Sequence, residues 1–161
     1  MNIHEFLGYF VPVVSVFASY LCGRLQSTHQ NTANTARERY EGFYIPYIRT
    51  LYKGHVYSGI PIDLVSTESI LMEFDLIMNN IQYLGSSSLS CVPQLYDSIL
   101  NLLEWRDGNE SFSSASAICD SEFLEFRKCA LLEASELSKA LRLPNTAIQL
   151  LQHLSAESTA P

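Results

Sequence analysis

The sequence is poor in glycine, proline and basic residues. Seven Gly and six Pro among 161 residues exclude a collagen-like chain and a Pro/Gly-rich disordered polymer. Ten Lys and Arg stand against seventeen Asp and Glu. The chain therefore lacks the basic face with which a general nucleic-acid binder displaces counterions from phosphates. Hydrophobic residues make up 47% of the chain, enough to bury one core without metal or disulfide support.

Catalytic and metal-binding motifs are also missing from the sequence. It contains no Gly-rich phosphate loop, no G-x-S-x-G and no H-E-x-x-H. The four Cys form no C-x-x-C pair, and the four His lie in four separate segments, which is not the spacing of a zinc site. We therefore expect a protein that is not an enzyme, with no catalytic residue, no metal and no cofactor.

Two sets of polar residues, paired carboxylates and a group around His55, could in principle form a catalytic site. The carboxylates of Glu73 and Asp75, and of Glu122 and Glu125, are close in sequence, but their positions on helices favour solvated faces. If the chain were an enzyme, its site would combine His55 with Tyr44, Tyr47 or Asp63, because an imidazole beside a Tyr hydroxyl or a carboxylate can move protons.

An uncharged run of eighteen residues, 6–23, lies near the N-terminus. As a helix it would measure about 27 Å, close to the roughly 30 Å of a bilayer core. It has neither the basic start nor the small-residue cleavage site of a signal peptide. We therefore predict a transmembrane anchor over residues 1–24. The alternative is a wholly soluble bundle in which residues 6–23 form the buried central helix.

The charges around this run predict its orientation. Arg24, Arg37 and Arg39 follow the run, whereas Glu5 precedes it. Because positive charge stays inside, the bulk of the chain is expected in the cytoplasm of a single-pass cell-membrane protein. Residues 1–54 carry a net charge of +2 and residues 55–161 a net charge of −9, so a slightly basic segment lies next to the predicted membrane surface. Residues 25–36 are polar and predict a stalk.

The strongest periodic pattern is a Tyr-rich stripe. Apolar and aromatic residues recur at helical spacing from Tyr40 to Tyr52. Pro46 lies inside the stripe and deprives the carbonyl of Gly42 of its helical partner, which predicts one helix with a kink at Pro46. Core packing is the simplest interpretation of the stripe. The functional interpretation is a partner-contact surface, because Tyr and Arg are enriched at interfaces; its residues would be Arg37, Arg39, Tyr40, Tyr44, Tyr47, Arg49, Tyr52 and His55.

Further helical stripes follow the Tyr-rich segment. Ser66 is placed to cap a helix that ends near Leu84, and residues 91–106 form the next helix, with Pro93 in its first turn. Asp120 would cap a helix to about Leu143, and a short last helix would follow. Residues 54–65, 85–90 and 107–117 are predicted loops. These patterns predict an all-α fold: a helical bundle of about four helices over residues 37–154, with a disordered tail at 155–161.

The sequence thus predicts a small membrane-anchored helical protein that scaffolds or regulates through protein–protein contacts. The expected partners are the membrane, through residues 6–23, and an unidentified protein; self-association is compatible with this role, and nucleic acid is not expected. In plan, an apolar run, a polar stalk and a helical domain resemble small membrane-anchored bacterial proteins, a likeness that implies no particular activity.

Overall fold

The computed structural model describes residues 32–53 and 61–157 of the chain. All regular elements in these residues are helices, and no strand occurs among them, which confirms the all-α prediction. The chain divides into two units, Met1–Ala36 and Arg37–Pro161. In the first unit the structure describes only residues 32–36, which are helical; the predicted anchor at 6–23 and most of the stalk lie outside the described residues. No helix within the described ranges is both long and apolar enough to cross a membrane.

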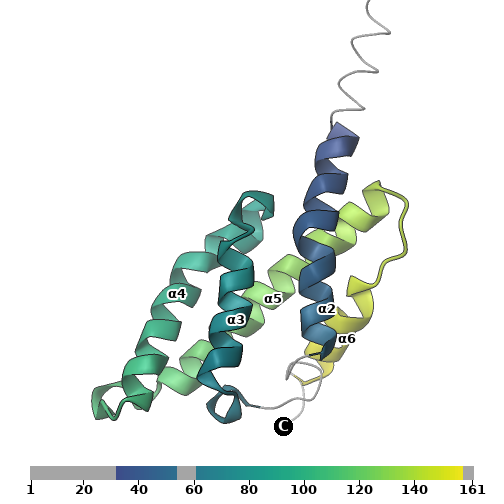
Figure 1. The fold of residues 1–161 in the computed structure, drawn as a ribbon. Coiled ribbons are helices and arrows are strands. Elements are labelled where there is room, and N and C mark those ends of the chain that lie inside the picture. Colours follow the sequence, from purple (N-terminus) through teal and green to yellow (C-terminus); the bar gives the residue numbers. More distant parts are fainter. Residues whose placement is uncertain (1–31, 54–60, 158–161) are drawn as a thin grey trace, which may run out of the picture. The chain divides into compact units, whose positions relative to one another are not determined.

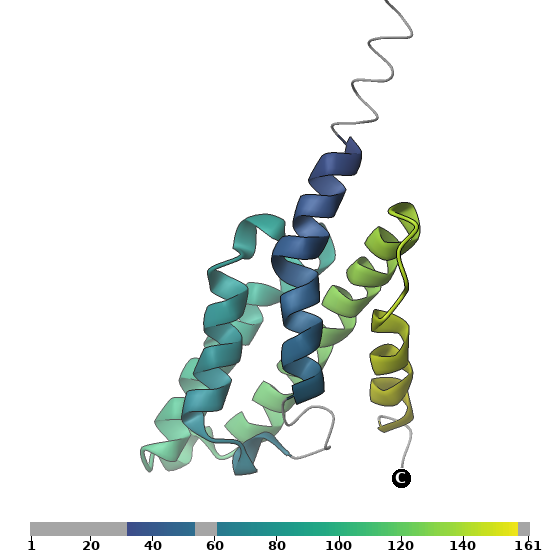
Figure 2. The ribbon, with the colours of Figure 1, turned by 45° about the vertical axis from the view of Figure 1, so that its right-hand side comes forward.

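The Tyr-rich segment forms one helix with a widened turn. Tyr40–Tyr44 form a π-helical turn, η1, in which the N–H of Ile45 donates to the carbonyl of Tyr40, and α2 (Ile45–Lys53) continues from it. A π turn accommodates one extra residue, and here it ends two residues before Pro46, which has no N–H to give and would press on the preceding turn of a regular helix. The irregularity that the structure shows next to the predicted kink at Pro46 is this π turn, and the ribbon runs through it as a single helix (Figures 1 and 2).

Helix α3 (Thr67–Met78) begins where the sequence predicts. Ser66 has extended backbone angles, and its hydroxyl accepts a hydrogen bond from the N–H of Ser69 at 3.2 Å, as an N-cap does. The helix ends before the predicted limit at Leu84, and the short 3₁₀ turn η4 (Ile81–Tyr83) follows it. Another 3₁₀ turn, η3 (Ile62–Leu64), lies in the predicted loop 54–65.

Helix α4 (Ser86–Arg106) starts earlier than predicted. The sequence predicts a loop at residues 85–90, and that prediction is wrong because the serines there form the first turn of α4. Pro93 consequently lies inside the helix instead of in its first turn. The start of α4 is capped by a carboxylate from a distant part of the chain, described below.

The last two helices also differ from the predicted limits. Helix α5 (Ala115–Ala140) follows the 3₁₀ turn η5 (Glu110–Phe112) and begins five residues before Asp120, which is therefore inside the helix and not its cap. Arg142 takes a left-handed conformation, with φ of 56°, after the end of α5. Helix α6 (Ala147–Glu157) extends into the first three residues of the segment 155–161 that the sequence predicts as the tail.

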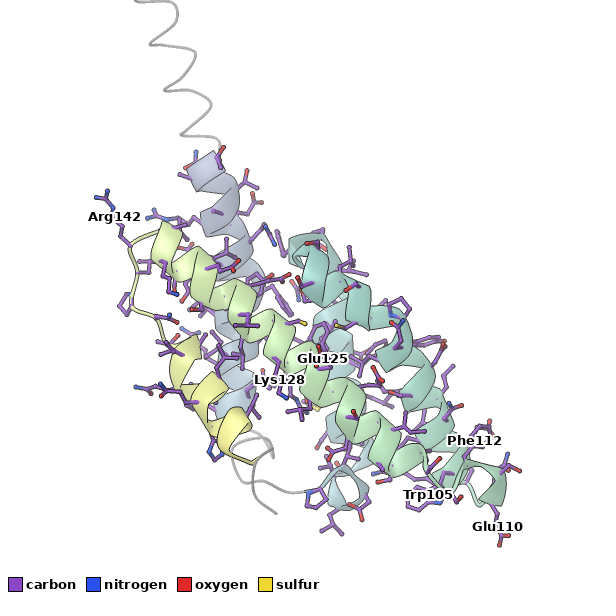
Figure 3. The ribbon with its side chains drawn as sticks, turned by 180° about the vertical axis from the view of Figure 1, so that it is seen from behind. Trp105, Glu110, Phe112, Glu125, Lys128 and Arg142 are labelled. Atoms are coloured by element: carbon purple, nitrogen blue, oxygen red, sulfur yellow. The ribbon has the colours of Figure 1, made fainter. Side chains whose placement is uncertain are left out.

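Helix α5 is the centre of the domain. It packs against α4 on one side and α6 on the other, and it runs diagonally behind α2 and α3 in Figure 1. Figure 3 shows α5 from the opposite side, in front of the other helices. The largest fully buried side chains come from η1, α2, α3, α4 and α5, and α6 adds the buried Leu150 and Leu154; the largest include Phe43, Tyr44, Tyr47, Ile77, Leu95, Phe123 and Phe126. One shared core therefore holds the helices of Arg37–Pro161 together.

Candidate functional site

Three of the predicted partner-contact residues lie in the core. Tyr40, Tyr44 and Tyr47 are 3%, 0% and 1% exposed. The ring of Tyr47 stacks on Phe43, with centroids 5.1 Å apart, and meets the ring of Phe126 edge-on at 5.7 Å. The structure therefore gives these rings the packing role that the simpler interpretation of the stripe assigns to them.

The other predicted contact residues are placed differently. Arg37 and Arg49 are exposed, and Tyr52 is 38% exposed, with its hydroxyl donating to the carbonyl of Thr146 at 3.4 Å. For these three residues partner contact stays a prediction. His55 lies outside the described residues, and so does the proposed geometry of His55 with Tyr44, Tyr47 or Asp63.

The structure reveals a charged group inside the core. The guanidinium of Arg127 on α5 donates to both carboxylate oxygens of Glu73 on α3, from Nε at 3.0 Å and from Nη2 at 2.8 Å. The hydroxyl of Tyr47 donates to the same carboxylate at 2.9 Å. Arg127 also lies 4.8 Å from the centroid of the Phe123 ring. The paired geometry compensates for the removal of both charges from water, and the group ties α2, α3 and α5 together.

Burial shifts the acid–base behaviour of this group. Burial by itself lowers the pKa of Arg127, but the charge of Glu73 and its hydrogen bonds outweigh burial, so the pKa ends above its ordinary value. The pKa of Tyr47 is raised by burial and then by the negative charge of Glu73. Arg127 thus stays charged and Tyr47 stays protonated at any ordinary pH. These states keep the ion pair and its hydrogen bond from Tyr47 intact and so stabilise the fold.

A second polar group caps the start of α4. Glu133 on α5 accepts hydrogen bonds from the backbone N–H groups of Gly85, Ser87 and Ser88, at 3.0, 3.0 and 3.2 Å. The hydroxyl of Ser88 also donates to it. The first N–H groups of a helix have no partner within the helix, and a carboxylate there also meets the positive end of the helix dipole. Glu133 therefore defines where α4 begins.

Tyr44 connects this cap to the Tyr-rich helix. Its hydroxyl donates to Glu133 at 2.7 Å and accepts from the N–H of Gly85 at 3.0 Å. Nearby, Nε of Arg39 donates to the carbonyl of Tyr83 at 2.9 Å. Arg39, one of the residues predicted to contact a partner, is half-buried and holds the end of η4 instead. A Cβ on Gly85 would lie 2.2 Å from Oε1 of Glu133. The carboxylate can therefore approach the backbone this closely only because residue 85 is Gly.

The pKa values at the cap follow from its contacts. Burial raises the pKa of Glu133, but hydrogen bonds from Ser88, Tyr44 and the backbone N–H groups outweigh burial and hold it below the ordinary 4.5. Burial raises the pKa of Tyr44 to about 12, and the hydrogen bond and charge of Glu133 add to the effect. Glu133 is therefore a carboxylate acceptor and Tyr44 a hydroxyl donor at neutral pH.

Sequence reasoning missed both polar groups. The prediction of a solvated face is wrong for Glu73, which is 4% exposed, although it fits the exposed Asp75. A usable signal was present: Glu73 lies three residues after Ile70 and four before Ile77, on the buried face of α3, and Arg127 lies four residues after Phe123 on the buried face of α5. A charge inside an apolar stripe indicates a buried partner.

A row of large apolar side chains remains on the surface of α3 and α4. It comprises Leu71, Met78, Leu89, Tyr96 and Leu100, which are between 37% and 48% exposed; we call it the α3–α4 apolar face. Leu71 and Met78 are seven residues apart on α3 and share one side of that helix. The three residues of α4 are spaced by seven and four, so they share a side as well.

An aromatic contact joins the two halves of this face. The ring of Phe74 on α3 stacks on the ring of Tyr96 on α4, with centroids 5.8 Å apart. Phe74 lies between Leu71 and Met78 at helical spacing, three residues after the first and four before the second. Leu71, Met78 and Tyr96 extend the apolar stripes of α3 and α4 beyond their buried positions, so the stripes are wider than the surface that the neighbouring helices cover.

Acidic residues border the α3–α4 apolar face. Asp75 on α3 lies four residues after Leu71, and Asp97 and Glu104 on α4 lie three residues before and four residues after Leu100. All three acids are exposed. Arg106 is the only Lys or Arg within α3 and α4, and its guanidinium donates to the carbonyls of Ile62 and Val65 at 2.9 and 2.7 Å. The surroundings of the face therefore carry negative charge.

The described residues contain no cluster of three or more His, Cys, Asp or Glu that could hold a metal ion. Comparisons with known proteins add no functional assignment: no family model, no curated protein and no solved structure matches this chain. The α3–α4 apolar face is therefore the candidate functional site.

Proposed function

We propose that this chain is a membrane-anchored docking protein without catalytic activity. Residues 6–23 anchor it in the cell membrane, the helical domain lies in the cytoplasm, and the α3–α4 apolar face binds a protein partner. The observation that carries the proposal is the face itself: two helical stripes of large apolar side chains, bridged by an aromatic stack and left uncovered by the rest of the domain. Exposed apolar surface of this kind, bordered by polar residues, is typical of protein contact sites.

The chemistry of the face favours one kind of partner. Its apolar side chains follow two neighbouring helices, and a partner helix can lay an apolar stripe along such a surface. Asp75, Asp97 and Glu104 would meet basic residues at the edges of that stripe. The proposed partner is thus an amphipathic helix whose apolar stripe is flanked by Lys or Arg.

The polar groups in the core support a structural role for the domain. Glu73, Arg127 and Tyr47 bind one another, and Glu133 and Tyr44 bind the start of α4. Each of these groups holds helices in a defined arrangement, and rigid helices present a contact surface with a low entropic cost of binding. A catalytic role would instead need a titratable group close to its transition between protonation states.

Affinity capture with two matched variants tests the docking proposal. Leu100 on α4 and Leu132 on α5 are both exposed, at 43% and 55%, but only Leu100 belongs to the α3–α4 apolar face. We expect Leu100→Lys to lose the captured partner by at least about tenfold, which corresponds to about 1.4 kcal/mol. Leu132→Lys should keep it. Equal capture by both variants, with both folded by circular dichroism, would contradict the proposal.

Membrane fractionation tests the anchor. The full-length protein should stay in the membrane pellet after a carbonate wash, because residues 6–23 carry no charge and approach the length of a bilayer core. Recovery of the protein in the soluble fraction would contradict the anchor. It would favour the alternative, in which those residues are the buried central helix of a wholly soluble binding protein.

A further inference from the structure

Two of the described cysteines face each other between α4 and α5. The Sγ atoms of Cys91 and Cys129 are 3.8 Å apart, and both residues are free thiols that are half-buried. They belong to the two helices that pack most extensively in the domain. Because the sulfur atoms are already in contact, small side-chain rotations bring them to bonding distance without separating the helices.

The surroundings of the two thiols differ. The thiol of Cys91 donates to the carbonyl of Ser87 at 3.3 Å, one turn back in α4. Burial raises the pKa of Cys129 to about 12, and the neighbouring Cys91 and the charge of Glu125 add to the effect. Cys129 is therefore a thiol at neutral pH.

We propose that Cys91 and Cys129 form a reversible intrachain disulfide, which links α4 to α5 when the protein meets a peroxide. This is a modification site in addition to the docking function proposed above, and it does not depend on that function. Cys91 and Cys129 are only partly buried, and Glu125, one turn before Cys129, is exposed. A small oxidant can therefore reach the two sulfur atoms.

The chemistry proceeds in two balanced steps. The thiolate of Cys91 attacks one oxygen of hydrogen peroxide, the O–O bond breaks, and Cys91 becomes a sulfenic acid while hydroxide leaves. The sulfur of Cys129 then attacks the sulfur of Cys91, the S–O bond breaks, and the hydroxyl leaves as water. Oε1 of Glu125 lies 3.9 Å from the Cys129 sulfur and can take up the thiol proton in the second step and pass it to the leaving hydroxyl, which becomes water. The net change is one peroxide reduced and two thiols oxidised.

The position of the pair gives the bond a structural consequence. Cys129 lies one turn before Glu133 on α5, and the N–H of Ser87, one turn before Cys91, donates to Glu133. The disulfide would thus link α4 to α5 close to the start of α4, where Glu133 already joins the two helices through hydrogen bonds. It would add a covalent constraint to a contact that otherwise depends on hydrogen bonds.

The test uses the full-length chain with Cys22→Ser and Cys119→Ala, so that only the proposed pair remains. After treatment with hydrogen peroxide, both thiols should resist alkylation, and the monomer should lose the mass of two hydrogen atoms. The thermal midpoint should rise by about 5 °C or more, because the bond closes a long loop. Dithiothreitol should restore both thiols and the original midpoint.

The single-cysteine variant Cys91→Ser in the same background is the matched control. Its Cys129 has no partner sulfur, so peroxide should produce neither the mass loss nor the rise in thermal midpoint. The proposal is overturned if peroxide leaves both thiols of the two-cysteine protein free to alkylate. It is equally overturned if the products are single-thiol oxides or disulfide-linked dimers instead of the intrachain bond.

Discussion

Individual charged residues hold this domain together from inside the core. The sequence predicts that Glu73 lies on a solvated face, whereas the structure pairs it with Arg127, which is 54 residues away in the chain. Each of the two charges would be costly to bury alone, and their pairing removes most of that cost. The helical stripes identify both positions as buried, but the identity of a partner depends on how α3 and α5 pack, which one sequence does not contain.

Breaking this pair should destabilise the domain strongly. Glu73→Leu and Arg127→Met each leave one buried charge without its partner, so each should cost about 3–5 kcal/mol of unfolding free energy. The double variant should cost less than either single change, because no unpaired charge remains. Tyr47→Phe should cost about 1 kcal/mol, the contribution of one hydrogen bond.

Urea unfolding of these variants measures the changes in stability. The control is Lys139→Met, at an exposed position near the end of α5, which should change the free energy of unfolding by less than about 0.5 kcal/mol. A double variant that simply adds the costs of the two single changes would show that Glu73 and Arg127 do not interact as described.

The cap carboxylate predicts how stability depends on pH. The pKa of Glu133 lies below its ordinary 4.5 in the folded protein, so its contribution is present above that value and is lost as the pH falls through the lowered pKa. Wild type should therefore be more stable than Glu133→Gln at about pH 6, and the difference should shrink toward about pH 3. Urea unfolding across this range measures it, and Glu136→Gln, an exposed position on the same helix, should show no such convergence.

At the scale of the helices, sequence patterns identified the elements better than their ends. The Ser66 cap of α3 is local and was predicted from the sequence, and its serine hydroxyl accepts a hydrogen bond from the N–H of Ser69. The start of α4 is set by Glu133, which lies more than forty residues beyond it, so a run of serines that suggests a flexible loop is helical instead. The kink predicted at Pro46 stays a prediction; the structure places a π turn at Tyr40–Tyr44 instead, because hydrogen-bond register is not encoded by the proline alone.

Gly85→Ala should disturb the start of α4. The added Cβ would lie 2.2 Å from Oε1 of Glu133, so the carboxylate has to move and its bonds to the first N–H groups are weakened. We expect a loss of about 1–3 kcal/mol in the free energy of unfolding. Thermal unfolding by circular dichroism is the measurement. The control is Ser86→Ala, at an exposed position; Gly108→Ala is unsuitable because the φ of +95° at Gly108 would itself cause strain. If Gly85→Ala is as stable as Ser86→Ala, Glu133 does not cap α4 as described.

At the scale of the whole molecule, the domain Arg37–Pro161 is a compact unit with a core of its own. Sequence periodicity predicted the all-α class and most of the buried positions, since apolar stripes on helices have to face one another. It could not predict which edge of each stripe stays uncovered, because that depends on how closely α3 and α4 approach α5. The α3–α4 apolar face is that uncovered edge.

A protein that begins at residue 37 should therefore fold on its own. It keeps the buried side chains of α2 to α6, so we expect a soluble helical domain whose thermal midpoint is within about 5 °C of the full-length value. The alternative with residues 6–23 as a central helix predicts aggregation, because their removal would expose a large apolar surface. Size-exclusion chromatography and circular dichroism of the shortened protein distinguish the two outcomes.

The most direct test of docking through the α3–α4 apolar face is photo-crosslinking in living cells. A photoreactive amino acid at position 96, on the face, should give a discrete crosslinked product with a partner protein that carries a basic amphipathic helix. The same amino acid at position 132, exposed on α5, should not give that product. A crosslink from position 132 to the same partner, or none from position 96 in cells that express the protein normally, would contradict docking through this face.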